Sequence, residues 1–402
     1  MDTKRTSAVT IKAVGDICPG DKYIMGLGVL SKTKKFGVDF PLMEARRLLS
    51  QGDIVLGNFE GVLSHKVKDG KKCPDLTFCG LPEFADALAR AGFNVINIAN
   101  NHSLEHGPEI FLETVDHLRR AGLKICGLRR NGSNYYSEPV VLTVNGRRVG
   151  ILGYNWVGVD NFPEADRYIA QSHDSIVNYT WERDRNPGTP LAEANKLVIN
   201  DIKTLRKEVD LLILMAHWGY EFVSAPPYNL TLEAQTFIEA GTDVIIGSHP
   251  HVLQGVQQYR GGFIFYSLGN FIFDSRARKQ RHTVVLEVTS DTKQGISYKF
   301  NPLYITQSFQ PKVGSSKQER YVEMEIAKSS QSLLSPNKKE LLDDDKVYRE
   351  YEKYYNASKL LVIINHFIAL REDLSVIKLI FKKGVGFSKI IWWRLKGQKI
   401  RW

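Results

Sequence analysis

The chain has 402 residues, of which 43% are apolar and 24% are charged, so it can bury one large core or two ordinary ones and is not disordered throughout. Of its formal net charge of +10, eight positive charges and no acidic residue lie in 374–402, which leaves +2 for the rest. A main body with so little excess charge gives no indication of nucleic-acid binding.

Cysteine spacing and hydropathy indicate the compartment. Cys18, Cys73, Cys79 and Cys126 form no CxxC pair, so we expect thiols in a reducing environment rather than a disulfide framework. The first apolar run, which begins at residue 9, is too short for a signal peptide, and no run of 18 apolar residues could span a membrane. These features favour a cytoplasmic protein.

Short β-branched runs alternate with amphipathic segments over most of the chain. The predicted strands are 9–14, 54–56, 95–98, 149–152, 211–215, 244–246 and 263–266, and the predicted helices are 41–51, 81–92, 107–122 and 230–241. Three of these helices end in Ala-Gly, the usual glycine stop. Such alternation predicts right-handed crossovers and a mostly parallel sheet.

Other segments predict a second sheet and an appended region. Residues 135–152 form a predicted hairpin with Asn145-Gly146 at its turn, and 283–289 and 297–305 are two further strands that we expect to close a second sheet. Residues 160–191 are expected to form a loop over the site or a mobile surface segment. We interpret 311–320 as a linker, so that 1–310 is a mixed two-sheet α/β sandwich and 311–402 a helical extension.

Five apolar runs end in residues that can bind metal ions. Carboxyl ends of buried strands gather at one edge of an α/β sheet, so we expect these residues to form one site. Oxygen and nitrogen ligands suit the divalent metals that assist hydrolysis. The five segments are Val14-Gly15-Asp16, Gly57-Asn58-Phe59-Glu60-Gly61, Ala99-Asn100-Asn101-His102, His217-Trp218-Gly219 and Gly247-Ser248-His249-Pro250-His251.

Each candidate ligand also has a plainer interpretation. His249 and His251 flank Pro250, and in an extended segment this spacing aims both rings to one side, but a surface loop could carry the same residues. Asp16 and Glu60 could be helix N-caps or solvated loop residues. Two neighbouring carboxylates repel unless a cation lies between them, so a shared metal site explains the pair better.

Asn101 and His102 suggest a division of roles. Adjacent side chains in a loop point apart, so we expect Asn101 on the metal and His102 facing the substrate as proton donor, unless Asn100-Asn101 simply makes a turn. His217 ends an apolar run where a satisfied core histidine is the alternative to a ligand. Glu221 is the expected acceptor for a ligand imidazole.

Six motifs occur in order along the chain, namely GDIC, GNFEG, ANNHSLEHG, HWGYEF, GSHPHVLQG and YSLGNFIFD. Together they resemble the CapA-type poly-γ-glutamate capsule synthesis proteins of the calcineurin-like metallophosphoesterase superfamily. The resemblance covers roughly residues 9–305 and implies a four-layer α/β/β/α sandwich with a dinuclear site at the strand ends. We expect one or two divalent ions there, and the sequence does not distinguish Mn, Zn and Fe. By motif, the resemblance implies metal ligands at Asp16, Glu60, Asn101, His217, His249 and His251, with His102 as proton donor.

Three residues depart from the pattern. Cys18 stands where the superfamily has a histidine, which would weaken one of the two metal positions. It could ligate a soft metal as thiolate, but a buried structural thiol is the favoured interpretation. Glu60 stands where the superfamily usually has a bridging Asp, and Glu105 stands where CapA-type loops often have Asp and is assigned a supporting role.

The C-terminal arm has a composition of its own. Residues 360–370 predict an apolar helix of core length, and 374–402 combine eight basic residues with three tryptophans. A basic amphipathic segment of this kind suits an anionic membrane surface, such as the inner membrane. The alternatives are a tail packed on the sandwich with a solvated basic face and, less favoured, a nucleic-acid tail.

Three functions follow as hypotheses. The first is a metal-dependent hydrolase that acts on a polymer or a small anionic substrate in poly-γ-glutamate or cell-envelope metabolism. The second is a non-catalytic subunit of a capsule synthesis complex with a structural or vestigial metal site. The third, a membrane-surface scaffold, depends only on the arm.

Overall fold

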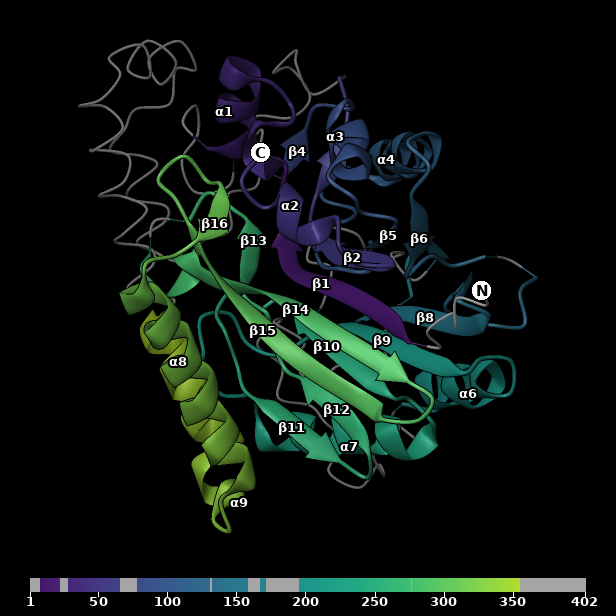
Figure 1. Cartoon of the computed structure of the whole chain (residues 1–402), viewed down its shortest axis with the longest axis vertical. Coiled ribbons are helices and arrows are strands. Elements are labelled where there is room, and N and C mark those ends of the chain that lie inside the picture. The colour runs from purple at the N-terminus through teal and green to yellow at the C-terminus, as the bar shows by residue number, and fades with distance from the viewer. Residues whose placement is uncertain are drawn as a thin grey trace, which may run out of the picture.

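The computed structural model describes residues 8–21, 28–65, 78–130, 132–157, 167–170, 195–275 and 277–354. Within these residues two β-sheets pack face to face, and helices cover the outer face of each sheet (Figure 1). The predicted α/β/β/α order of layers is therefore confirmed.

The first sheet is mixed. Its strand order is β16-β15-β14-β1-β2-β5-β6, and β13 pairs with β1 off this path. Strands β1, β2, β5, β6 and β13 run parallel, whereas β14, β15 and β16 add antiparallel pairs. The bounds are β1 (Val9–Ile17), β2 (Ile54–Phe59), β5 (Val95–Asn97), β6 (Lys124–Cys126), β13 (Asn270–Ile272), β14 (His282–Asp291), β15 (Gly295–Ile305) and β16 (Pro311–Val313).

The second sheet has the order β11-β12-β10-β9-β8-β7, and its four central strands are parallel. A separate small sheet pairs β3 (Val62–Leu63) with β4 (Cys79–Gly80). The bounds of the second sheet are β7 (Val140–Val144), β8 (Arg147–Asn155), β9 (Leu211–His217), β10 (Val244–Ser248), β11 (Val256–Tyr259) and β12 (Gly262–Phe265).

Helices on the first sheet are α1 (Val29–Phe36), α2 (Arg46–Leu49), α3 (Phe84–Arg90) and α4 (Pro108–Arg120), and those on the second are α6 (Lys196–Arg206) and α7 (Tyr228–Ala240). Two 3-10 turns, Phe40–Leu42 and Lys279–Arg281, and the helices α8 (Ser316–Leu334) and α9 (Lys338–Leu341) complete the described elements. The helix predicted over 41–51 is shorter than expected, and α1 and α6 were not predicted.

Alternation along β1 shows how the layers are held. Ile11 and Ala13 face the core between the sheets, whereas Val14 and Ile17 belong to the core under the outer helices. A strand buried on both faces is what a near-continuous apolar run predicts. The central strands are therefore fixed on both faces, and their carboxyl ends are positioned accurately.

The hairpin prediction is confirmed. Strands β7 and β8 pair antiparallel, and the two residues between them, Asn145 and Gly146, have φ values of 51° and 81°. Two consecutive positive φ values define the type I′ turn that Asn-Gly favours.

Two sequence predictions are wrong. The strands predicted at 283–289 and 297–305 are β14 and β15, and they extend the first sheet instead of closing the second. The reason is the non-local pairing of β14 with β1, which runs from Val9↔Ser290 to Ala13↔Leu286. The linker predicted at 311–320 is β16 and the start of α8, where Ser315 and Gln318 form a capping box.

The first part of the C-terminal region therefore packs on the sandwich. Val322 and Ile326 of α8 join the core between the sheets, and Leu333 joins the core under α6 and α7. In Figure 1, α8 runs along one side of the two sheets. Residues 360–370, the arm at 374–402 and most of 160–191 lie outside the described residues. Among the described residues, no helix is long and apolar enough to cross a membrane.

A buried ion pair in the first sheet generates a stability prediction. Lys12 of β1 is opposite Glu287 of β14, and their side chains, which form a salt bridge, are 2% and 29% exposed. The Lys12 ammonium holds the pKa of Glu287 below its usual range. The stability that this pair contributes is present above the ordinary glutamate pKa and is lost as the pH falls through the lowered value.

We expect Glu287→Gln to lower the free energy of unfolding at pH 7 by about 3 kcal/mol, because it leaves a buried ammonium without its counter-charge. Chemical denaturation at pH 7 and at pH 3 measures this, and the difference from the native protein should shrink at the lower pH. The double variant Lys12→Met/Glu287→Gln should recover most of the loss. Equal stability of Glu287→Gln and the native protein at pH 7 would contradict the prediction.

Candidate metal centre

The six predicted ligands lie together where strand ends of both sheets meet. Asp16 and Glu60 come from the ends of β1 and β2, and Asn101 follows β5, all in the first sheet. His217 ends β9 of the second sheet, and the other two histidines follow β10. A chain of contacts links the six residues.

Two buried carboxylates form the centre of the site. Asp16 and Glu60 are both fully buried, and each offers, together with His217, a ligand atom within 4.8 Å of the others. His251 lies between the carboxylates, with Nδ1 3.4 Å from Asp16 Oδ2 and Nε2 3.6 Å from Glu60 Oε1. Burying two carboxylates is costly without a cation, and this donor set of carboxylate, imidazole and amide groups fits a divalent metal.

Gly15 explains how the Asp16 carboxylate reaches this position. A Cβ at residue 15 would lie 1.8 Å from the carbonyl oxygen of Gly269. Only glycine at this position of β1 therefore lets the chain before β13 come so close. The backbone N–H of Asp16 donates to that same Gly269 oxygen over 3.0 Å. The Gly-Asp pair therefore lets β13 approach β1 beside the site.

His249 and His251 converge by a route other than the one predicted. The segment is not extended, because His249 and His251 have φ values of 92° and 57°. Their rings still lie 5.7 Å apart, and the His249 ring lies 4.8 Å from that of His217. Left-handed backbone at non-glycine residues costs about 1–3 kcal/mol each and is maintained only where surrounding contacts enforce it.

Those contacts are visible on both sides of Pro250. The N–H of His249 donates to Asp16 Oδ2 over 3.0 Å, and the N–H of Phe222 donates to the Pro250 carbonyl over 2.7 Å. The His251 ring packs 4.7 Å from the ring of Phe273. The strained segment is therefore fixed to both sheets.

Asn101 and His102 do not diverge as predicted. Residues 101–106 form tight turns, and Asn101 Nδ2 lies 3.1 Å from His102 Nε2. Asn101 Oδ1 is 2.8 Å from His217 Nε2, a hydrogen-bonding distance that brings two of the predicted ligand atoms together. His102 Nε2 is also 3.7 Å from Glu60 Oε1, so both side chains point into the site.

The supporting carboxylates take different places. Glu105 Oε2 lies 2.9 Å from His102 Nδ1, and the His102 ring stacks on Phe78 with centroids 3.5 Å apart, so the ring has a fixed orientation. Glu221 Oε1 lies 3.5 Å from His251 Nε2, so among the predicted ligands Glu221 accompanies His251.

Two asparagines of the site were not singled out from the sequence. Asn58 and Asn270 are the register partners of Asp16 in the strands on either side. Asn58 Nδ2 donates to Asp16 Oδ1 over 2.8 Å and lies 3.1 Å from His217 Nδ1, and Asn270 Oδ1 lies 2.8 Å from His251 Nδ1. The signal was present, because both residues occur in a Gly-Asn-Phe triplet that ends or begins a strand.

Cys18 packs beside the site, against the two phenylalanines that contact His102 and His251. It is fully buried with Phe78 and Phe273, and its Sγ is 3.9 Å from the Gly20 carbonyl. This placement agrees with the structural interpretation of the thiol.

The geometry predicts that variants of the candidate ligands lose bound metal and that a histidine variant outside the site does not. Glu60→Gln and His217→Ala should each lose most of the bound divalent metal, because each removes a ligand from the buried group. His117→Ala on α4 is the matched control and should keep the metal. Metal-to-protein ratios after dialysis measure the effect, and undiminished ratios in both site variants would show that the metal binds elsewhere.

Comparison with known proteins places the chain in a family. Residues 10–275 match the family described as "Bacterial capsule synthesis protein PGA_cap". The chain is 29% identical over 286 residues to the capsule biosynthesis protein CapA of Bacillus anthracis, covering 71% of this chain and 64% of that protein. It is 26% identical over 287 residues to the PGA biosynthesis protein CapA of Bacillus subtilis (strain 168), covering 71% and 69%.

The chain thus spans about two thirds of the length of these relatives. A solved structure of a putative 5'-nucleotidase from Staphylococcus aureus aligns with a TM-score of 0.46 and 13% identity, covering 79% of this chain and 58% of that one. With the family match spanning most of the two-sheet sandwich and every candidate ligand, this chain belongs to the PGA_cap family of bacterial capsule synthesis proteins.

Proposed function

We propose that the protein is a metal-dependent hydrolase that acts on an anionic substrate of poly-γ-glutamate or cell-envelope polymer metabolism. The observation that carries this proposal is the buried group of Asp16, Glu60 and His217, with a partly exposed histidine beside it. Family membership supports the polymer pathway, and the oxygen and nitrogen donors support Mn, Zn or Fe over softer metals.

Asp16, Glu60, Asn101, His217, His249 and His251 would hold one or two divalent ions. When bound, such an ion polarises the substrate and lowers the pKa of a coordinated water toward 7. The side chains contribute orientation: Asn58 holds both Asp16 and His217, so the ligands are pre-arranged before substrate binds.

His102 is the proposed proton donor. Its side chain is 16% exposed, which lets a substrate reach it, and its Nε2 faces the site beside Glu60. Glu105 contacts the opposite ring nitrogen, so it orients the ring and stabilises the protonated form that donates a proton to the leaving group.

His102→Ala should lower turnover by about 10²–10⁴-fold while the metal stays bound, because general acid–base catalysis contributes that range. His117→Ala is a matched control, since His117 also has a glutamate partner on its own helix, Glu113 at 3.5 Å. Turnover is measured against a panel of phosphoesters and γ-glutamyl peptides, with and without a chelator. Loss of metal from His102→Ala would make it a ligand and overturn its assigned role.

A non-catalytic role in a capsular polymer synthesis complex is the second candidate. It is favoured by a relative from Mycobacterium tuberculosis that is named a probable polyglutamine synthesis accessory protein, 26% identical over 201 residues. Metal bound in the native protein without turnover of any compound in the panel would favour this role over hydrolysis.

Residues 374–402 lie outside the described residues, so the role of the C-terminal arm stays a prediction. We propose that the protein acts in the cytoplasm and that 374–402 contacts the inner membrane surface, since eight basic residues contribute about 1 kcal/mol each near anionic lipid. The full chain should co-sediment with anionic vesicles at low salt, and a truncation after Asp373 should not. Equal sedimentation of the two proteins, or none of either, would leave a tail that packs on the sandwich.

A further inference from the structure

The helix α8 lies outside the residues that match the family, yet it contacts the loops that carry the candidate ligands. One hydroxyl group joins two of these loops. Ser329 Oγ donates to the Ser224 carbonyl over 2.7 Å and accepts from the Gly255 N–H over 2.8 Å, and the residue is only 4% exposed.

Both loops belong to the metal centre. Ser224 follows Glu221 by three residues in the loop after β9, and Gly255 follows His251 by four in the loop after β10. Glu221 and His251 contact each other across these loops at 3.5 Å. Ser329 therefore links the loops a few residues beyond the point where their site residues meet.

Close approach of the helix requires a glycine. A Cβ at Gly255 would lie 2.5 Å from Ser330 N and 2.7 Å from Ser329 C, so the backbone of α8 rests directly on this loop. The neighbouring Ser330 hydroxyl accepts from the Val256 N–H over 2.9 Å, on the strand β11 that leads away from the site. These adjacent serines make comparable bonds, but only that of Ser329 joins the two site loops.

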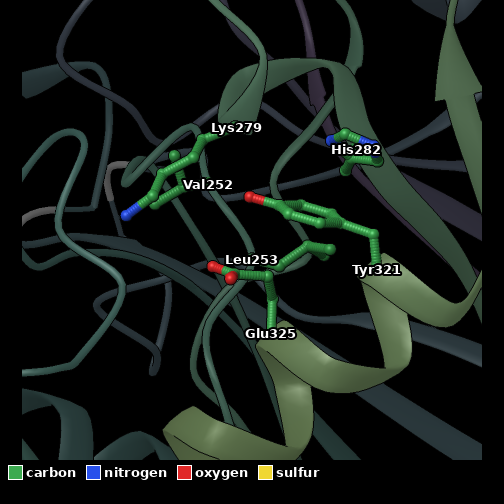
Figure 2. A pocket seen from close by; sticks show the side chains of 6 residues that line it. All are labelled: Val252, Leu253, Lys279, His282, Tyr321 and Glu325. Atoms are coloured by element: carbon green, nitrogen blue, oxygen red, sulfur yellow. The ribbon is translucent and has the colours of Figure 1, made fainter. Parts of the chain in front are cut away.

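The same helix covers the residues that directly follow His251. Figure 2 shows Tyr321 and Glu325 of α8 beside Val252 and Leu253, around a pocket that Lys279 and His282 also line. Its volume of about 10 Å³ has room for roughly one water molecule, so we interpret it as a packing contact, not a ligand site.

The chain beyond α8 continues across the loop after β9. The Tyr228 N–H donates to the Leu342 carbonyl over 2.8 Å, and Tyr220, next to Glu221, packs against Tyr348 and Tyr351 with centroids 6.0 and 5.7 Å away. Lys279 Nζ donates to Ser224 Oγ and to the Tyr354 hydroxyl, both over 3.2 Å. The described C-terminal region thus contacts three segments around the site.

We propose that residues 316–354 are part of the functional unit and that Ser329 is a positioning residue of the metal centre. His249 and His251 have a strained backbone that is maintained only where surrounding contacts enforce it. Two hydrogen bonds already join the loops: the Phe222 N–H donates to the Pro250 carbonyl, and Gln254 Nε2 donates to the Val223 carbonyl. Ser329 adds the contact that fixes both loops to α8. This inference rests on the proposed metal centre.

The test uses the full chain and measures Mn²⁺ binding by electron paramagnetic resonance, which reports on metal without requiring turnover. Ser329→Ala should weaken Mn²⁺ binding by about 10-fold, at the low end of the effect of residues that orient ligands. Ser329→Thr retains the hydroxyl and should restore binding. Ser330→Ala is the control, because it removes a similar bond from α8 without separating the site loops. Thermal unfolding midpoints of the two alanine variants should be similar.

Two results would overturn the inference while the metal centre stands. The first is an unchanged Mn²⁺ affinity in Ser329→Ala. The second is an equal loss of Mn²⁺ affinity in Ser329→Ala and Ser330→Ala, which indicates an effect of general helix packing. If the native protein binds neither Mn²⁺ nor Zn²⁺ nor Fe²⁺, the proposed metal centre fails first and this inference fails with it.

Discussion

Asp16 carries a fully buried carboxylate at the point where β1 of the first sheet ends beside the loop after β10 of the second. A carboxylate in such a place is destabilising unless hydrogen bonds and opposite charge compensate for the lost water. Asn58 and the His249 backbone N–H donate to its oxygens, and His251 lies beside it. Because these partners come from both sheets, satisfying this one group requires the sheets to meet in a single arrangement.

The meeting of the two sheets places a strained backbone segment, at His249, next to the Asp16 carboxylate. The backbone N–H of His249 donates to Asp16, and His249 does so in a left-handed conformation. The ring of His249 lies 4.8 Å from the ring of His217. The Asp16 contact therefore fixes both the backbone of the histidine loop and the direction in which its side chains point, which links packing between the sheets to the chemistry of the site.

Local sequence was sufficient to identify the elements that carry this site. Asp16, Glu60, His217 and His249 each follow a mainly apolar run, and burial of both strand faces makes such runs conspicuous. Asn58 and Asn270 were missed because they lie within strands, where a polar residue signals a role only once its neighbour across the sheet is known. The same limit applies to β14, whose pairing with β1 depends on residues nearly three hundred positions apart along the chain.

Positive φ at His249 and His251 could not be predicted either, since left-handed backbone is expected of glycine and not of a residue flanking proline. The position of α8 could not be predicted either, because its amphipathic pattern indicates a helix but not the surface that the helix covers. Its position matters for the candidate site of this chain. The matched residues 10–275 include every candidate ligand, yet Gly255 is held by Ser329 and β14 completes the sheet beside β1. The unit that packs around the candidate site is therefore longer than the segment that carries the motifs, since β14 and α8 lie beyond residue 275.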